Sequence, residues 1–144
     1  MEELVSSVQA CLAGMDSADP GASLDALDAL CELVCGAFGD DGLIIGATVR
    51  AEDAVSKLVR MLTWYSASVV EPARGQPPSS DGTALDGTAL AICSTLLVLL
   101  ANLASDAVDP KSHLTKEALL ASGGLQAFVG GLFSEVRAAV EAIV

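Results

Sequence analysis

Hydrophobic residues dominate one long stretch of the chain, positions 87–105, which contains no charged side chain. Drawn as a helix, this stretch carries apolar residues on every side. Such a helix must be buried, either within protein or within lipid. Its length of 19 residues would also suit a membrane span. The flanks and the content of the stretch therefore decide between two kinds of protein.

The flanks of this stretch favour burial within protein. Asp86 and Asp106 bracket it, and the nearest basic residue is Lys111, so no excess of positive charge orients a membrane span. Serine, threonine, cysteine and asparagine also interrupt its leucines. We expect a core helix wrapped by other helices, with Leu100 in the core. An integral membrane protein with one span near 87–105 is the alternative.

Amphipathic patterns predict three helices before this core stretch. The first runs over positions 2–14. The second begins near Ser23, its N-cap, and ends at the turn 39–42. A short apolar piece at 43–47 is expected to form one or two helical turns, and the acids at 52–53 open the third helix. The expected apolar stripes are Leu24, Leu27, Cys31, Val34 and Phe38 in the second helix, and Ala54, Val55, Leu58, Val59 and Leu62 in the third.

Three further helices are expected after the core stretch. Asp109 and Pro110 predict an N-cap followed by proline at the first helical position, and Gly123 predicts the end of that helix. Another helix follows over 125–133, and the last begins at Ser134. The apolar stripe of the last helix is still running at the final residue, so we expect the chain to stop in mid-helix.

Positions 66–85 interrupt the helical pattern. Proline, glycine and serine are concentrated there, and such segments rarely form packed structure. The sequence Asp-Gly-Thr-Ala-Leu occurs twice in tandem, at 81–85 and 86–90, and a five-residue period matches neither helix nor strand. We expect a flexible insertion at 66–85.

Composition supports an all-α fold. The chain of 144 residues is 52% hydrophobic but only 3% aromatic, and alanine and leucine supply most of the apolar residues. These residues favour helix over strand. The length suits a single domain, so we expect one helical domain over 1–144.

An internal repeat relates two parts of the chain. The apolar positions of the segment 55–62 coincide with those of the segment 125–132, and a further match links 99–101 to 142–144. With 66–85 taken as an insertion, one unit recurs at a period of about forty residues, which is typical of a helical solenoid.

The last third of the chain resembles an armadillo repeat, with a good match over 97–144 and a weaker match over 22–62. The matching residues are Leu103–Asp106, Leu119–Val129 with the pair Gly123-Gly124, and Ser134–Ile143. The resemblance implies an armadillo/HEAT-like right-handed helical solenoid of about two to three repeats. Members of the family mostly act as scaffolds, adaptors, transport receptors or chaperone cofactors, so it also implies a non-catalytic protein–protein interaction module. The family's groove asparagine matches Asn102, which becomes a candidate partner-binding residue.

The net charge of −12 is concentrated in the first part of the chain. Residues 1–53 hold eleven acids and one base, Arg50, whereas residues 54–144 hold eight acids and six bases. Such a field repels nucleic acid and anionic membrane surfaces. A protein partner with a basic segment fits this charge. The alternative is that the acids only keep an apolar chain soluble.

Two further groups are candidates for partner binding. Asp25, Asp28 and Glu32 line one face of the second helix at spacings of three and four. Trp64 and Tyr65 lie at a helix end beside the expected insertion, where aromatic rings can anchor a partner. The alternatives are a solvated helix face for the acids and an ordinary edge of the core for the two rings.

The final helix offers a candidate surface for self-association. Val136, Val140 and Ile143 form an apolar stripe that no following segment covers. The end units of helical repeats need a polar outer face. We therefore expect this helix to self-associate, or the chain to be a piece of a longer solenoid.

Residues that could carry chemistry are few. His113 is the only histidine and is expected near solvent. Cys31 and Cys35 share a helix face and could form half of a metal site, but no second pair has ligand spacing, so we expect them to be small buried hydrophobic residues. We expect no enzyme activity, cofactor or metal. Cysteines without a disulfide pattern favour a reducing compartment, the cytoplasm or the nucleus.

Overall fold

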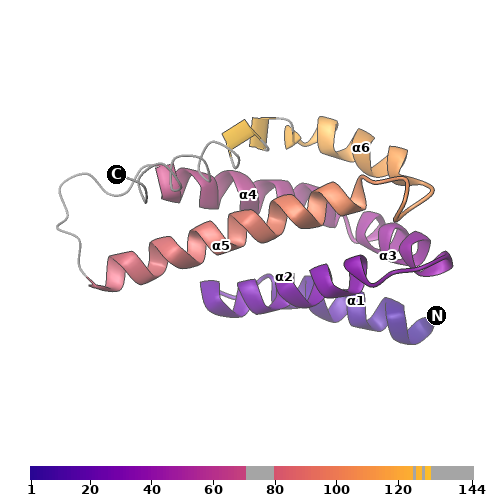
Figure 1. The fold of residues 1–144 in the computed structure, drawn as a ribbon, viewed down its shortest axis with the longest axis horizontal. Coiled ribbons are helices and arrows are strands. Elements are labelled where there is room, and N and C mark those ends of the chain that lie inside the picture. Colours follow the sequence, from indigo (N-terminus) through magenta and orange to yellow (C-terminus); the bar gives the residue numbers. More distant parts are fainter. Residues whose placement is uncertain (71–79, 125, 128, 131–144) are drawn as a thin grey trace.

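The structure, a computed structural model, describes residues 1–70, 80–124, 126–127 and 129–130, and within these ranges every regular element is an α-helix (Figure 1). The all-α prediction is therefore confirmed for the described part of the chain. The helices are α1 (Glu2–Gly14), α2 (Pro20–Cys35), α3 (Asp40–Ala51), α4 (Ala54–Val70), α5 (Ser80–Leu103) and α6 (Ser112–Ala121).

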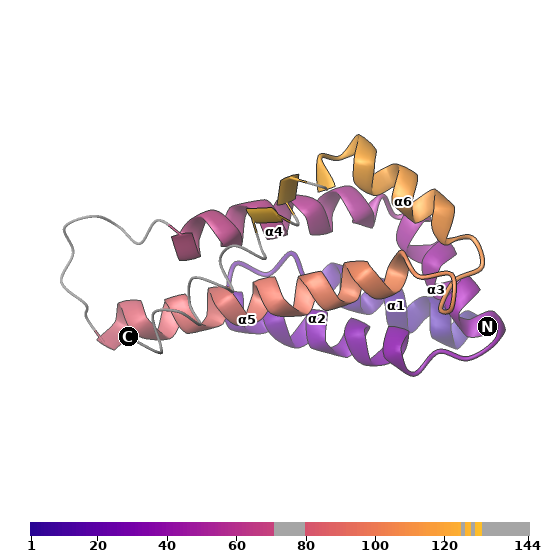
Figure 2. The same cartoon turned by 45° about the horizontal axis from the view of Figure 1, so that its top comes forward.

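The central helix is α5, which lies between α2 and α4 (Figures 1 and 2). Helix α1 packs on α2 and α3, and α6 packs on α4. Ile92, Leu96 and Leu100 on α5 are fully buried, so the core helix that the apolar pattern predicted is present and is wrapped by protein. Among the described helices, none is both long and apolar enough to cross a membrane.

The start of α2 differs from the prediction. Asp19, rather than Ser23, is the N-cap, because its carboxylate accepts a hydrogen bond from the Gly21 amide at 3.2 Å and Pro20 occupies the first helical position. Ser23 is buried one turn inside the helix. Its hydroxyl donates to the carbonyl oxygens of Met15 and Ser17, each at 3.2 Å, and so holds the α1–α2 turn against the helix.

The helix between α2 and α4 is longer than the one or two turns that the sequence predicted. Helix α2 ends at Cys35, so Phe38 lies outside its apolar stripe and is 84% exposed. Asp40 and Asp41 then begin the twelve-residue α3 instead of ending α2, since acids stabilise the positive N-terminal end of a helix. Ile45 on α3 is fully buried, whereas the prediction allowed only one or two turns here.

The prediction of a flexible insertion over 66–85 is wrong at both ends of this segment. Helix α4 continues to Val70, and α5 already begins at Ser80, so 66–70 and 80–85 are helical; positions 71–79 lie outside the described residues. The predicted buried face of α4 is confirmed, and Ser66 extends it: its hydroxyl lies 3.7 Å from the buried Cys93 sulfur. Serine and valine are compatible with helix when packing favours it.

The junction between α3 and α4 recurs after α6. Helix α3 ends at Ala51 and is followed by Asp53 at φ 53°, whereas α6 ends at Ala121 and is followed by Gly123 at φ 77°. The amides of Asp53 and Gly123 both donate to the carbonyl three residues earlier, at 3.1 and 3.3 Å. Gly123 follows Asp53 by seventy positions, the offset that also relates the repeated segments 55–62 and 125–132.

The two left-handed residues allow a matched test. Gly123→Ala should lower the free energy of unfolding by about 1–2 kcal/mol, because a Cβ disfavours this backbone conformation. Asp53→Gly should leave the stability unchanged or raise it by up to about 1 kcal/mol for the converse reason. Urea denaturation followed by circular dichroism measures both. Equal destabilisation by the two substitutions would contradict the equivalence of the junctions.

Candidate functional site

The acidic row of α2 lies beside α5. Thr95 of α5 donates a hydrogen bond from its hydroxyl to the Asp28 carboxylate at 3.2 Å. Asp25 and Glu32, one turn before and after Asp28, are both exposed. All three acids are therefore exposed on α2, and Asp28 contacts the central helix.

Asn102 lies on the same side of α5 as Thr95. It follows Thr95 by two helical turns on α5, and the half-exposed Val98 lies between them. The Asn102 side chain donates to the Val98 carbonyl of its own helix at 2.8 Å, so one of its amide hydrogens is already bonded. We call the surface formed by Asp25, Asp28, Glu32, Thr95, Val98 and Asn102 the α2–α5 face.

Trp64 and Tyr65 do not join this face. They lie on α4, which is on the other side of α5 from α2 in both views (Figures 1 and 2). Their rings meet edge to face with centroids 4.8 Å apart, and Trp64 is 65% exposed. Burial raises the pKa of the Tyr65 phenol, with a further contribution from Cys93. The predicted site residues thus separate into two surfaces. Val136, Val140 and Ile143 lie outside the described residues.

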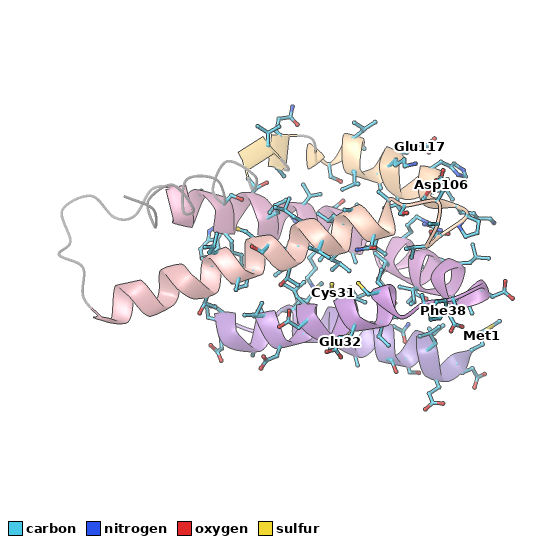
Figure 3. All side chains as sticks on the ribbon, viewed as in Figure 1. Met1, Cys31, Glu32, Phe38, Asp106 and Glu117 are labelled. Carbon is cyan, nitrogen blue, oxygen red and sulfur yellow. The ribbon has the colours of Figure 1, made fainter. Side chains whose placement is uncertain are left out.

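Phe38 is a surface residue that the sequence prediction missed. It lies in the turn after α2, followed by Gly39 at φ 60° and by the exposed acids Asp40 and Asp41 (Figure 3). An exposed aromatic ring among carboxylates is suited to a partner that is both basic and apolar. Gly36 and Gly39, on either side of Phe38, are the sequence signal that could have revealed the end of the helix.

Arg50 is turned inward. Its guanidinium donates to the Asp109 carboxylate at 2.7 Å and to the Thr115 hydroxyl at 2.9 Å. The Asp109 side chain has no exposed surface, and that of Arg50 is only 15% exposed. The other Asp109 oxygen accepts from the Lys111 amide at 2.9 Å, and Lys111 is the N-cap position of α6. Asp109 therefore does not cap α6 as predicted; it links the loop before α6 to α3.

Two glycines of α3 make room for this link. A Cβ at Gly42 would overlap the Val108 carbonyl oxygen, and a Cβ at Gly46 would overlap the Asp109 carboxylate. Because the glycines are four residues apart, they share one side of the helix. The loop 108–109 can therefore lie directly against the backbone of α3.

The inward position of Arg50 determines the charge of the surface. All eleven acids of residues 1–53 are exposed, whereas the only base among them is paired with buried Asp109. The next base, Lys57, pairs with Asp16 and donates to the Leu12 carbonyl at 3.4 Å. The surface formed by α1, α2 and α3 is thus acidic, without an exposed base of its own.

The cysteines are less buried than predicted. Cys93 is fully buried, but Cys31 is only partly buried and Cys35 is exposed. The sulfur atoms of Cys31 and Cys35 lie 4.0 Å apart. Burial, the adjacent Cys35 and the nearby carboxylates of Asp28 and Glu32 raise the pKa of the Cys31 thiol to about 11. Within the described ranges, no three or more histidine, cysteine or acidic residues are grouped so that they could hold a metal ion.

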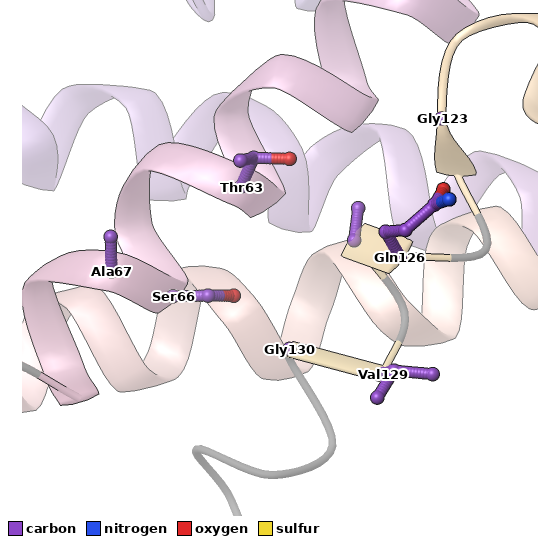
Figure 4. Close-up of a pocket in the computed structure, with 8 residues that line it drawn as sticks. Thr63, Ser66, Ala67, Gly123, Gln126, Val129 and Gly130 are labelled. Atoms are coloured by element: carbon purple, nitrogen blue, oxygen red, sulfur yellow. The ribbon is translucent and has the colours of Figure 1, made fainter.

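An apolar cavity of about 620 Å³ lies between α4 and the segment after α6 (Figure 4). The Thr63 hydroxyl on its wall donates to the Val59 carbonyl at 3.0 Å, and that of Ser66 contacts Cys93. With these hydroxyls engaged, the cavity suits an apolar side chain better than a polar substrate. Its lining residues are Thr63, Ser66, Ala67, Gly123, Gln126, Ala127, Val129 and Gly130.

No family model, no curated protein and no solved structure matches this chain.

Proposed function

We propose that this chain is a non-catalytic protein-interaction module that binds a basic segment of its partner along the α2–α5 face. The observation that carries the proposal is the acidic surface of α1, α2 and α3, from which Arg50 is withdrawn by its pairing with Asp109. If the acids served only solubility, Arg50 would not need to be withdrawn from the surface. A cationic partner, in contrast, is attracted more strongly when Arg50 is withdrawn.

The proposed fold of the module is a short armadillo-like solenoid. Two features support it: the junction geometry of Asp53 and Gly123, which recurs after seventy residues, and the packing order. Helix α1 contacts α2 and α3, and in the same order α4 contacts α5 and α6. In such a solenoid, α2 and α5 would be the long third helices of successive repeats, whose exposed sides form the binding surface.

The proposed ligand runs along α2 toward Phe38. Lysine or arginine side chains would pair with Asp25, Asp28 and Glu32, and an apolar side chain would contact the Phe38 ring near Asp40. Each exposed ion pair contributes about 0.5 kcal/mol. Removal of the three charges should therefore weaken binding about tenfold.

The test uses a fluorescent Lys/Arg-rich peptide with one central leucine, titrated with the protein and followed by anisotropy. Conversion of Asp25, Asp28 and Glu32 to Asn or Gln should weaken binding about tenfold, and Phe38→Ala should weaken it without lowering stability. The matched control converts three exposed acids elsewhere, Glu2, Glu3 and Glu117, to glutamine. Equal losses in both triple variants would show attraction to the net charge alone and would contradict the α2–α5 face.

A further inference from the structure

The last turn of α2 carries two thiols in contact. The Cys31 and Cys35 sulfur atoms are 4.0 Å apart, and neither residue is fully buried. Cys35 is the final residue of the helix and is exposed, so solvent reaches the pair. A small ligand can therefore approach both sulfurs together.

The helical spacing of the pair disfavours a disulfide. Side chains four residues apart on a helix have their Cβ atoms about 5–6 Å apart, whereas a disulfide requires about 3.5–4.5 Å. A disulfide between Cys31 and Cys35 would therefore unwind the last turn of α2. An ion between the sulfurs avoids this distortion, because metal–sulfur bonds of about 2.3 Å can join sulfurs up to about 4.6 Å apart.

We propose that Cys31 and Cys35 bind one soft cation, Cu(I). Thiolate ligands select soft ions, and Cu(I) is satisfied by two of them, whereas a structural zinc ion takes four ligands. The described residues place no third histidine, cysteine or carboxylate suitably for a metal.

Two acidic side chains adjoin the pair and attract a free cation toward it. Asp28 precedes Cys31 by three positions, and Glu32 precedes Cys35 by three positions. Both acids are exposed. On binding, the two thiol protons pass to the solvent and two copper–sulfur bonds form, with no change in the oxidation state of copper. The site thereby passes from neutral to one net negative charge. Asp28 and Glu32 attract the incoming cation at a distance, whereas the stability of the bound site comes from the two copper–sulfur bonds.

The test is an anaerobic competition between the reduced protein and the Cu(I) chelator bicinchoninate. Wild-type protein should withdraw one Cu(I), and X-ray absorption should show two sulfur neighbours at the metal. Cys31→Ser and Cys35→Ser should each abolish the withdrawal, whereas the control Cys11→Ser should retain it. Circular dichroism identifies any variant that has not folded.

Three results would overturn the proposal. The first is withdrawal of copper by wild type that is no stronger than by the Cys31→Ser/Cys35→Ser double variant. The second is three or more sulfur neighbours, which would require ligands from outside the pair. The third is zinc binding through the same cysteines without Cu(I) binding.

A separate experiment tests the argument against a disulfide. Mild treatment with diamide should leave Cys31 and Cys35 unlinked in the folded protein. A disulfide formed without loss of helix would contradict the argument from helical spacing.

Discussion

Replacing Asp109 by alanine should lower the free energy of unfolding by about 3–5 kcal/mol, because the change leaves the Arg50 guanidinium buried without its charged partner. Asp109 is fully buried and bonds both Arg50 and the Lys111 amide, so one substitution releases α3 from the loop before α6. Denaturant unfolding followed by circular dichroism measures the loss. The control Glu117→Ala removes an exposed carboxylate from α6 and should change stability by less than about 0.5 kcal/mol.

A double variant separates the loss of the ion pair from the cost of leaving one charge buried without a partner. In Arg50→Met/Asp109→Leu both charges are replaced by apolar side chains, and the protein should be more stable than Asp109→Ala. If the single variant Asp109→Ala unfolds at the same denaturant concentration as wild type, the ion pair does not hold α3 against the loop.

Replacing Leu100 by alanine should destabilise the protein by about 2–5 kcal/mol, through lost apolar burial and the cavity that remains. Leu100 is fully buried on α5, the helix that contacts both α2 and α4. Val98→Ala is the matched control on the same helix: Val98 is 48% exposed, so the change should cost less than about 0.5 kcal/mol. Thermal and urea unfolding of detergent-free protein give both values, and similar losses at the two positions would contradict the placement of the core.

Helices with a strong apolar period were predictable from the sequence. The bounds of α1 and the buried face of α4 agree with their patterns because local spacing decides which side of such a helix is apolar. Helix α3 was not predictable in the same way. Gly42 and Gly46 lower its intrinsic helix propensity. These glycines allow the close approach of Val108 and Asp109, which lie more than sixty positions away in the sequence.

The candidate site was predictable to a similar extent. The acidic row on α2 follows from its spacing alone, but the contact of Asp28 with Thr95 depends on how α2 packs on α5. The exposure of Phe38 depends on where α2 stops, and a helix boundary is the least certain part of a periodic pattern. No local signal distinguished Asp109 as the partner of Arg50 rather than as a helix cap.

The withdrawal of Arg50 also has a kinetic consequence. With Arg50 turned inward, the acids of residues 1–53 are exposed without an exposed base beside them, and they create a negative field around α1, α2 and α3. A positively charged molecule approaching by diffusion is drawn toward this surface before any contact is made. Such steering accelerates the encounter and leaves dissociation to short-range contacts. The length of time for which a complex persists would then depend on residues such as Phe38, which contribute nothing to the attraction at long range.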